Sequence, residues 1–139
     1  MRIAIVLGTS RPTGNTAQLI NHFVASTNNP VSVYSLSDYQ VLPYDYHFAN
    51  QDDDFPALIS EVIAAHEIIV LATPIYWYAP SAQMKAFMDR LTDLLEINKT
   101  LGRQLKGEYT HATSRCLISA LSQGLNIKAQ LAGMVTPFQ

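Results

Sequence analysis

The chain has 139 residues, 48% of them hydrophobic, and a formal net charge of −2. This length suits one packed domain, expected over residues 1–139, and is too short for two. The sequence has no run of Lys and Arg and no long apolar stretch, which argues against a nucleic-acid partner, a membrane span and a secretory signal. Its single cysteine, Cys116, excludes an internal disulfide and fits a reducing cytoplasm.

Apolar runs and helical spacing alternate along the first part of the chain. Residues 3–7, "IAIVL", are apolar throughout and predict a strand covered on both faces. A helix is expected to begin near Gly14 or Asn15 and a second strand to cover residues 31–36, "VSVYSL". The apolar residues that recur at helical spacing between them, and predict the buried helix face, are Leu19, Ile20, Phe23 and Val24.

A long segment rich in aromatic residues, 37–54, follows the second strand. Loops of this length in small domains are usually functional, and the stretch from Tyr39 to Phe48 is a candidate for shaping a substrate pocket, or else a surface loop packed on the core. Asp54 is expected to cap the next helix, with Pro56 in its first turn. The predicted buried stripe of that helix is Phe55, Leu58, Ile59, Val62 and Ile63.

The second half of the chain predicts a third strand at residues 68–72, a helix opened by Pro80 and a fourth strand at residues 115–121. Residues 96–113 show little pattern, and a short fifth strand is expected near residues 133–138. On the third helix, Lys85 and Asp89 predict a solvated ion pair. Alternation of strands and helices predicts an α/β fold with a doubly wound parallel sheet, that is, three layers with helices on both faces.

The unusual segments of the sequence all follow predicted strands. The segment "GTSRPTGNT" follows the first strand, "TPIYWYAP" the third and "LSQG" the fourth. Because the carboxyl ends of parallel strands lie at one edge of a sheet, we expect these three segments to meet there. Ligands of such folds bind at this edge, where the strand order reverses.

The first of these segments, residues 8–16, combines hydroxyl, amide and cationic groups at the start of a helix. Free N–H groups at a helix N-terminus bind anions, and Arg11 adds a fixed positive charge. The segment lacks both the lysine of a nucleoside-triphosphate loop and the glycine pattern of a dinucleotide fold, so it favours a phosphate monoester. An ordinary capped helix start is the alternative, although it does not explain the arginine. The candidate phosphate-binding residues are Thr9, Ser10, Arg11, Thr13, Gly14, Asn15 and Thr16.

Two motifs together resemble the NADPH-dependent FMN reductase family. "GTSRPTGNT" is similar to the family's phosphate loop, and "TPIYWYAPSAQMKAFMDRL" to its second signature, Pro-x-Tyr followed by Pro, Lys and Asp-Arg. The resemblance implies a flavodoxin-like sheet of order 2-1-3-4-5, here with a shortened C-terminal part, in a single FMN-binding domain. It also implies that Thr9, Arg11, Asn15 and Thr16 contact the FMN phosphate.

The resemblance further implies which residues lie against the isoalloxazine ring. Those after the third strand are Pro74, Ile75, Tyr76 and Trp77, and those after the fourth are Ser122, Gln123 and Gly124. Aromatic side chains suit the flat apolar face of a flavin. The alternative for Tyr76, Trp77 and Tyr78 is ordinary packing at the start of a helix.

The function implied by the resemblance is an oxidoreductase that passes hydride from NADH or NADPH through FMN to a small acceptor, such as a quinone, an azo or nitro compound or free flavin. No side chain is predicted as a catalytic acid or base, and no metal is expected because no two histidines share ligand spacing. A homodimer or homotetramer is expected from an apolar face left uncovered. The alternatives are a flavodoxin-type electron carrier, for which Asp52–Asp54 gives a sparse acidic rim, and a shortened non-catalytic relative.

Overall fold

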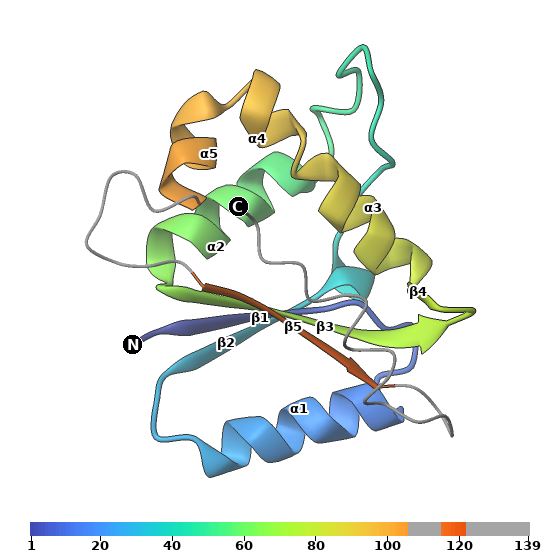
Figure 1. The fold of residues 1–139 in the computed structure, drawn as a ribbon, viewed down its shortest axis with the longest axis vertical. Coiled ribbons are helices and arrows are strands. Elements are labelled where there is room, and N and C mark those ends of the chain that lie inside the picture. The colour runs from blue at the N-terminus through green and yellow to red at the C-terminus, as the bar shows by residue number, and fades with distance from the viewer. Residues whose placement is uncertain (106–114, 122–139) are drawn as a thin grey trace.

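The computed structural model describes residues 1–105 and 115–121, the latter segment by its backbone alone. Strands and helices alternate over this part of the chain (Figure 1). In chain order the elements are β1 (Ile3–Leu7), α1 (Asn15–Ser26), β2 (Val31–Ser35), the short 3-10 helix η1 (Leu36–Asp38), α2 (Phe55–Ala65), β3 (Ile68–Tyr76), β4 (Ala79–Pro80), α3 (Ala82–Arg90), α4 (Asp93–Glu96), α5 (Lys99–Leu105) and β5 (Arg115–Leu121).

The parallel part of the sheet has the order β2-β1-β3-β5, and β4 pairs antiparallel with the end of β3. In this register Ile5 of β1 lies between Val33 of β2 and Val70 of β3. Because β5 is the fourth strand that the sequence predicts, the order 2-1-3-4 and the flavodoxin-like α/β class are confirmed. The fifth strand expected near residues 133–138 lies outside the described residues.

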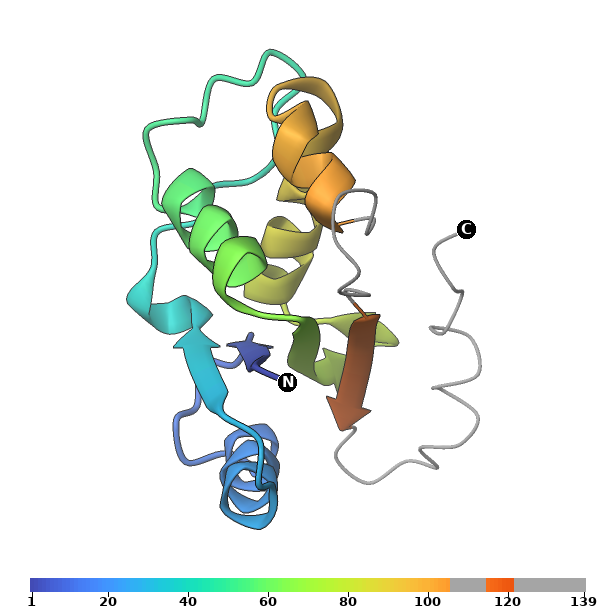
Figure 2. The same ribbon diagram turned by 90° about the vertical axis from the view of Figure 1, so that its left-hand side faces the viewer.

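The fold has three layers, with α1 on one face of the sheet and α2 to α5 on the other (Figures 1 and 2). All five residues of β1 are buried, as its uninterrupted apolar sequence predicts for a strand covered on both faces. Ala4 and Val6 join the core under α2 and α3, whereas Ile3, Ile5 and Leu7 pack toward Ala17 and Ile20 of α1. This period of two is the pleat of the strand.

The predicted buried stripe of α2 is confirmed at all five positions. The prediction that the Asp54 side chain caps this helix is wrong in its chemistry. Asp54 occupies the N-cap position, but its carboxylate accepts a hydrogen bond from Gln40 N, at 2.7 Å. The carboxylate of Asp53 accepts instead from Phe55 N, at 3.1 Å. Asp53 therefore satisfies the first N–H group of α2, because the Asp54 carboxylate is bonded to Gln40 in the preceding loop.

The predicted buried face of α1 is largely wrong. Ile20 is buried together with Thr16 and Ala17, but Leu19, Phe23 and Val24 are 40%, 41% and 37% exposed. Helical spacing reports that one side of a helix is apolar, not how much of that side a neighbour covers. In the part of the chain that the structure describes, α1 is the one helix on its face of the sheet, so its flanks stay open.

The sequence prediction ended the third strand too early. β3 continues through Pro74 to Tyr76, since Ile75 and Tyr76 pair with Pro80 and Ala79 of β4. Pro80 therefore lies in a strand, and α3 begins at Ala82 with Ser81 as its N-cap. Residues 99–105, expected to lack pattern, form α5.

Candidate functional site

The segment between β1 and α1, residues 8–14, is called the phosphate loop below. Two hydrogen bonds within the loop shape it: Arg11 N donates to Thr9 Oγ1 at 3.2 Å, and Gly14 N donates to Arg11 O at 3.0 Å. Gly14 is the N-cap of α1, and no side chain caps that helix. The sequence prediction that α1 begins at Gly14 or Asn15 is confirmed. The alternative of an ordinary capped helix start does not explain the hydroxyl and amide side chains of residues 9–16, because none of them caps the helix.

The start of α1 offers several unused hydrogen-bond donors. Its first helical bond runs from Gln18 N to Gly14 O, so the N–H groups of Asn15, Thr16 and Ala17 precede it, and among residues 1–105 no acceptor satisfies them. Thr16 is only 5% exposed, yet its hydroxyl has no partner in the described part of the chain. Buried hydroxyls are normally hydrogen-bonded. The helix start therefore has the donors that an anion requires.

Arg11 is exposed, and its guanidinium has no carboxylate partner among the described residues. An unpaired cation beside a helix N-terminus adds to the positive potential there. The other predicted phosphate residues differ in their surroundings. Thr9 is buried, whereas Thr13 is exposed and its backbone carbonyl accepts a hydrogen bond from Gln18 Nε2. Ser10 Oγ accepts a hydrogen bond from Gln83 Nε2 at 2.8 Å.

The segment that follows in space, residues 73–81, is called the aromatic hairpin below. Tyr76 pairs with Ala79, so Trp77 and Tyr78 form a tight turn with φ values of 49° and 63°. Turns of this kind normally take Asn-Gly or Asp-Gly. A left-handed conformation of a residue with a side chain costs about 1–2 kcal/mol. Two bulky aromatic residues here mark a position where local stability is sacrificed, a pattern typical of functional sites.

The aromatic side chains of this hairpin lie in solvent. Trp77 is 95% exposed, Tyr78 76% and Tyr76 52%, and Figure 1 shows the hairpin projecting from the end of β3 beyond α3. The alternative that these three residues pack at a helix start is therefore wrong. Adjacent exposed aromatic side chains usually mark a binding surface. The predicted ring residues divide accordingly: Pro74 is buried inside β3, Ile75 is half-buried, and Tyr76 and Trp77 are open.

The phosphate loop and the aromatic hairpin follow β1 and β3, which are neighbours in the sheet. Their carboxyl ends lie at the same edge, and Gly8 N donates to Ala72 O there at 2.8 Å. The third predicted segment, Ser122, Gln123 and Gly124, lies outside the described residues. The structure thus brings the first two predicted segments to one edge, as the topology requires.

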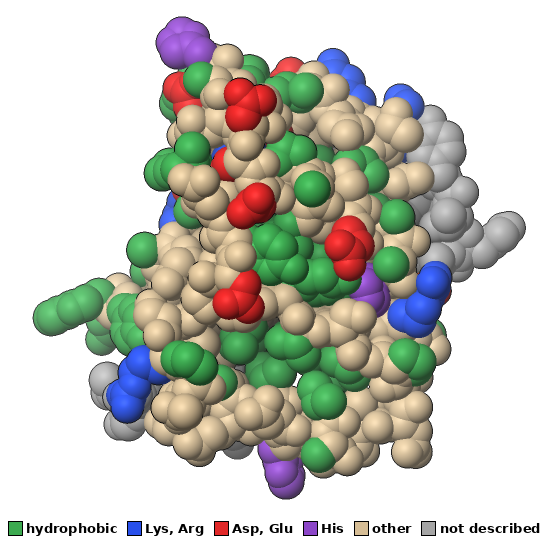
Figure 3. All heavy atoms as spheres, turned by 180° about the vertical axis from the view of Figure 1, so that it is seen from behind, with side chains coloured by type: hydrophobic (Ala, Val, Ile, Leu, Met, Phe, Trp, Pro, Cys, Tyr) green, Lys and Arg blue, Asp and Glu red, His purple; other side chains and the backbone are tan. Residues whose placement is uncertain are grey.

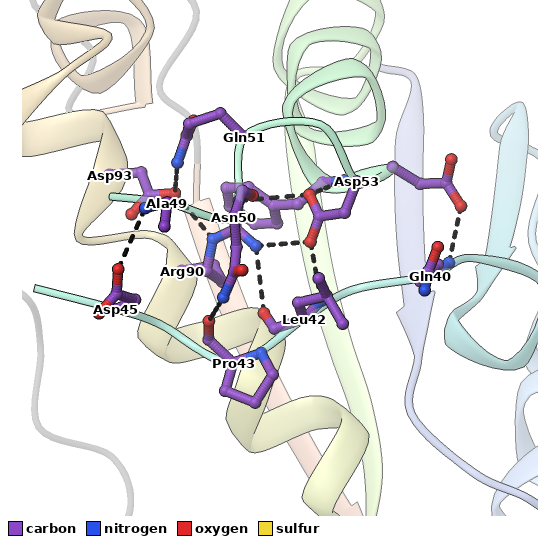
Figure 4. A network of polar contacts seen from close by, with 12 residues as sticks. Gln40, Leu42, Pro43, Asp45, Ala49, Asn50, Gln51, Asp53, Arg90 and Asp93 are labelled. Atoms are coloured by element: carbon purple, nitrogen blue, oxygen red, sulfur yellow. Dashed lines mark hydrogen bonds and ion pairs between the residues drawn. The ribbon is translucent and has the colours of Figure 1, made fainter. Parts of the chain in front are cut away.

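A buried ion cluster that the sequence prediction missed lies at the C-terminal end of α3. Arg90, at the end of α3, is 1% exposed and stacks over the ring of Phe55 at 4.7 Å. Its guanidinium pairs with Asp53 at 2.6 Å and with Asp93 at 2.7 Å (Figure 4). Burial alone would lower the pKa of Arg90, but the hydrogen bonds to both carboxylates outweigh it and raise the pKa.

Arg90 fastens the long loop between η1 and α2 to α3. Its Nη1 donates to Leu42 O at 3.1 Å, and its Nη2 donates to Asn50 O at 2.6 Å (Figure 4). Asp53 in turn accepts from Leu42 N at 2.7 Å. Between these anchor points lie Tyr44, Tyr46 and Phe48, whose rings contact edge to face. Two of the three acidic residues at 52–54 therefore stabilise the loop, since Asp53 is buried against Arg90 and the Asp54 carboxylate accepts a hydrogen bond from Gln40 N.

The polar side chains of α3 and of the end of α2 are bonded within the protein. Lys85 and Asp89 form the expected exposed ion pair. His66 is buried at the end of α2, where its ring nitrogens lie 3.0 Å from Ser32 Oγ and 3.1 Å from Val62 O. Within residues 1–105 and 115–121 no three His, Cys, Asp or Glu side chains are placed to hold a metal ion. None of the helices described there is long and apolar enough to cross a membrane.

The fold and the site define a class: a flavodoxin-like α/β protein with a loop after β1 that leads to unsatisfied hydrogen-bond donors and an exposed aromatic hairpin after β3. The model of the family "NADPH-dependent FMN reductase" matches residues 1–135. The chain therefore belongs to the NADPH-dependent FMN reductase family, as the two motifs predict.

A curated relative supports this membership. The protein YwqN of Bacillus subtilis (strain 168), named "Putative NAD(P)H-dependent FMN-containing oxidoreductase", is 33% identical over an alignment of 101 residues that covers 68% of this chain and 54% of that protein. The chain spans about half the length of this relative.

Solved structures share the fold. The structure of Trp repressor binding protein from Bacillus subtilis has a TM-score of 0.67 at 22% identity, over 96% of this chain and 70% of that one. An FMN-dependent NADH-azoreductase from Bacillus anthracis str. Ames Ancestor in complex with FMN has a TM-score of 0.55 at 15% identity, over 94% and 74%. At these identities the similarity concerns the fold.

Proposed function

We propose that the protein is an NAD(P)H-dependent oxidoreductase that binds FMN at the carboxyl edge of its sheet and reduces a small acceptor. The observation that carries this proposal is the pairing of an unsatisfied helix N-terminus with a strained, exposed aromatic turn at the same edge. The first suits a doubly charged phosphate, and the second suits a flat ring. Family membership supplies the identity of the ligand.

The phosphate end of the site has donors and charge but no acid. The free N–H groups of Asn15 and Thr16, the buried Thr16 hydroxyl and the Arg11 guanidinium would hold the phosphate. A side chain on Gly14 would crowd the loop itself, because its Cβ would lie 3.1 Å from Arg11 Cβ and 3.2 Å from Arg11 O. The anion would supply the hydrogen-bond acceptors that the helix start lacks. Satisfying partly buried donors in this way is favourable.

The ring end of the site is the aromatic hairpin. We propose that Tyr76 and Trp77 cover the isoalloxazine ring, while N–H groups of the hairpin serve its polar edge. Burying these rings under the cofactor would remove apolar surface from water, which stabilises the complex. Ser122, Gln123 and Gly124 remain the proposed contacts on the third segment.

When bound, FMN supplies hydride transfer from the nicotinamide to the acceptor. The chain's own residues bind the cofactor and leave one side open to both substrates. The described residues of the two segments include no Asp, Glu, His or Lys, so we assign no catalytic acid or base. Quinones, azo or nitro compounds and free flavin are the proposed acceptors, and the aromatic stretch from Tyr39 to Phe48 is the proposed wall of their pocket.

The flavodoxin-type carrier is the weaker proposal. Such a carrier needs an acidic rim to dock its redox partners, whereas Asp53 is buried against Arg90 and Asp54 is tied to Gln40. The measurement that separates the two is oxidation of NADPH at 340 nm by the FMN-loaded protein, with a quinone as acceptor. Repeated turnover supports the enzyme, and binding of FMN without turnover supports a carrier or a non-catalytic relative.

Replacing Arg11 by Ala tests the phosphate end directly. The charge-assisted contact is worth about 1.5–3 kcal/mol, so the Kd for FMN should rise by roughly 10- to 150-fold. The Kd for riboflavin, which has no phosphate, should change less than threefold. Lys85→Ala, which removes an exposed cation from α3, is the matched control and should leave both values unchanged. An equal loss for both flavins would contradict our placement of Arg11.

We also propose that the protein forms a homodimer or homotetramer. Between Arg11 and Asp38 the sequence contains no Asp, Glu, Lys or Arg, and this stretch forms α1 and the edge strand β2. Phe23 and Val24 on α1 and Val33 on β2 are exposed. In Figure 3 the acidic side chains lie over the upper part of the molecule, and the lower part, where α1 lies, shows hydrophobic side chains without them. An edge strand without charges is usually covered.

A further inference from the structure

The phosphate loop and the aromatic hairpin are joined by hydrogen bonds through Ser81 and Gln83. We propose that these two residues position the cofactor site by coupling the two segments, so that an anion bound at the phosphate loop raises the affinity of the hairpin for a flat ring. This inference rests on the proposed function, since it concerns the same site, and the experiment below separates the failure of one from the failure of the other.

The first step of the coupling closes the open end of the hairpin. Thr73 lies on β3 before the strained turn, and Ser81 lies directly after β4. Ser81 N donates a hydrogen bond to Thr73 Oγ1 at 3.0 Å. Both residues are buried, at 1% and 2% exposure. In a low-dielectric setting such a bond is strong and its geometry is well fixed.

The second step ties this closed end to the phosphate loop. The Ser81 hydroxyl donates to Gly8 O at 2.6 Å and accepts from Met84 N at 3.2 Å, so it caps α3 and holds the end of β1 at once. The contact leaves no room for a side chain on Gly8, because a Cβ there would lie 2.8 Å from Met84 Cβ. Any movement of the phosphate loop at Gly8 is therefore transmitted to the start of α3.

The third step is a hydrogen bond at the surface between the phosphate loop and the first turn of α3, the helix that directly follows the aromatic hairpin. Gln83, in the first turn of α3, donates from Nε2 to Ser10 Oγ at 2.8 Å. Ser10 acts as acceptor here, which leaves its own hydroxyl hydrogen available for an anion. An anion that orders Ser10 therefore also restrains Gln83, two residues beyond Ser81.

Restraint matters because the turn at Trp77 and Tyr78 is held in a disfavoured conformation. An element of this kind keeps its shape only when its surroundings determine it. Ordering the base of the hairpin in advance reduces the conformational entropy that ring binding must remove, and this produces positive cooperativity between two ligands. By linkage the effect is reciprocal: a bound ring must tighten the hold on the anion by the same factor.

The experiment uses two probes that each fill one half of the site, inorganic phosphate and riboflavin. The Kd for riboflavin is measured by flavin fluorescence with and without saturating phosphate, and the ratio of the two values is the coupling. We expect a ratio of about 5 or more in the wild-type protein. Trp77 is the one tryptophan of the chain, so phosphate alone should also change the tryptophan emission.

The variants Ser81→Ala and Gln83→Ala should bring the ratio to within about twofold of one. Gln83 is partly exposed, so its substitution preserves the fold even if loss of the buried Ser81 hydroxyl unfolds the protein. Gln18→Ala is the matched control, because Gln18 Nε2 also bonds the phosphate loop, at Thr13 O, but does not reach the hairpin. This control should keep the wild-type ratio. The double variant Ser10→Ala, Gln83→Ala should have the same ratio as Gln83→Ala alone, because the two residues act through one hydrogen bond.

The outcomes are distinct. If FMN and riboflavin bind but phosphate leaves the riboflavin Kd unchanged, the coupling is wrong and the proposed function stands. If Gln83→Ala and Gln18→Ala reduce the ratio equally, the effect is general loosening of the loop and the roles assigned to Ser81 and Gln83 are wrong. If neither flavin binds the wild-type protein, the proposed function fails and the coupling fails with it.

Discussion

At the scale of single residues, the site combines strain with unsatisfied groups. Trp77 and Tyr78 have left-handed backbone conformations and exposed side chains, and Thr16 has a buried hydroxyl without a described partner. Each feature is unfavourable for the isolated chain. Each becomes favourable only when a ligand supplies a ring or an anion, so stability and binding should respond in opposite directions to substitution.

Replacing Trp77 by Gly tests this opposition. Relief of the left-handed strain, about 1–2 kcal/mol, is partly offset by the greater freedom of glycine in the unfolded chain, about 0.4–1 kcal/mol. Urea unfolding should therefore show equal or slightly higher stability. The Kd for FMN, followed by flavin absorbance, should rise about 2- to 10-fold because one aromatic contact is lost. Tyr76→Gly, at an extended strand position, should instead lower the stability.

Arg90 holds the long loop before α2 against the end of α3. Replacing it by Met would leave Asp53 and Asp93 buried without their cation. Breaking a buried pair in this way costs about 3–5 kcal/mol. We expect Arg90→Met to lower the free energy of unfolding by about that amount in urea titrations, whereas the exposed Lys85→Met should change it by less than about 1 kcal/mol. Equal effects of the two variants would contradict the anchoring role.

The grouping of hydrogen-bond donors before α1 was visible in the sequence, whereas the Arg90 cluster was not, for a physical reason. The donors of the loop are neighbours along the chain, so their grouping is visible in a short segment. The bonds of Arg90 to Asp53, Asn50 and Leu42 span 37, 40 and 48 residues. Such contacts exist only after the chain folds. The turn at Trp77 was hidden for a similar reason, since no local preference predicts an aromatic residue at positive φ.

At the scale of secondary structure elements, the parallel strands were the most predictable part. The uninterrupted apolar run of β1 reflects its burial on both faces, and the structure confirms three predicted strands closely, at Ile3–Leu7, Val31–Ser35 and Arg115–Leu121. Element ends were less predictable, because tertiary contacts determine them. β3 extends to Tyr76 only because β4 returns to pair with it. Likewise, the burial of α1 depends on neighbours that helical spacing does not reveal.

The amino ends of β1 and β3 are fastened by an ion pair with a pH-dependent effect. Arg2 Nη2 lies 2.7 Å from Glu67 Oε1, and Arg2 N donates to the same carboxylate. These hydrogen bonds lower the pKa of Glu67 to about 2. The carboxylate is thus more acidic in the folded state, so its stabilising contribution is complete above pH 4.5 and is lost as the pH falls toward 2.

The prediction is a smaller acid sensitivity in Glu67→Gln. Between pH 4.5 and 2, the wild-type protein should lose more stability than this variant, as measured by thermal unfolding across that range. Arg2→Gln removes the partner that lowers the pKa, so it should flatten the profile in the same direction. Parallel profiles for all three proteins would show that the pair contributes nothing measurable.

At the scale of the whole molecule, charge is unevenly distributed. The stretch that forms α1 and β2 has no charged residue between Arg11 and Asp38, whereas the long loop before α2 contains five aspartates, counting Asp38, and no lysine or arginine. Solvated surfaces of small domains usually carry mixed charges. This asymmetry supports an assembled form in which α1 and β2 lie against another copy.

Sedimentation velocity tests the assembly. We expect the wild-type protein to sediment as a dimer or tetramer at micromolar concentration. Introducing a charge on the uncharged surface, as in Phe23→Lys or Val33→Lys, should shift it toward the monomer, because a buried unpaired cation is unfavourable. Leu95→Lys, on the opposite side of the sheet and also exposed, is the matched control. A wild-type monomer at these concentrations would contradict the assembly.

The way in which Arg90 holds the long loop has a consequence for engineering. At Leu42 and Asn50 its guanidinium donates hydrogen bonds to backbone carbonyls rather than to side chains. These bonds therefore do not depend on which residues lie between those two positions. Apart from Asp45, whose carboxylate accepts a hydrogen bond from Ala49 N at 3.1 Å, residues 43–49 can thus be treated as a replaceable cassette. A library randomised there, with Asp53 and Arg90 untouched, should keep a high fraction of folded members while presenting new chemistry at the rim of the scaffold.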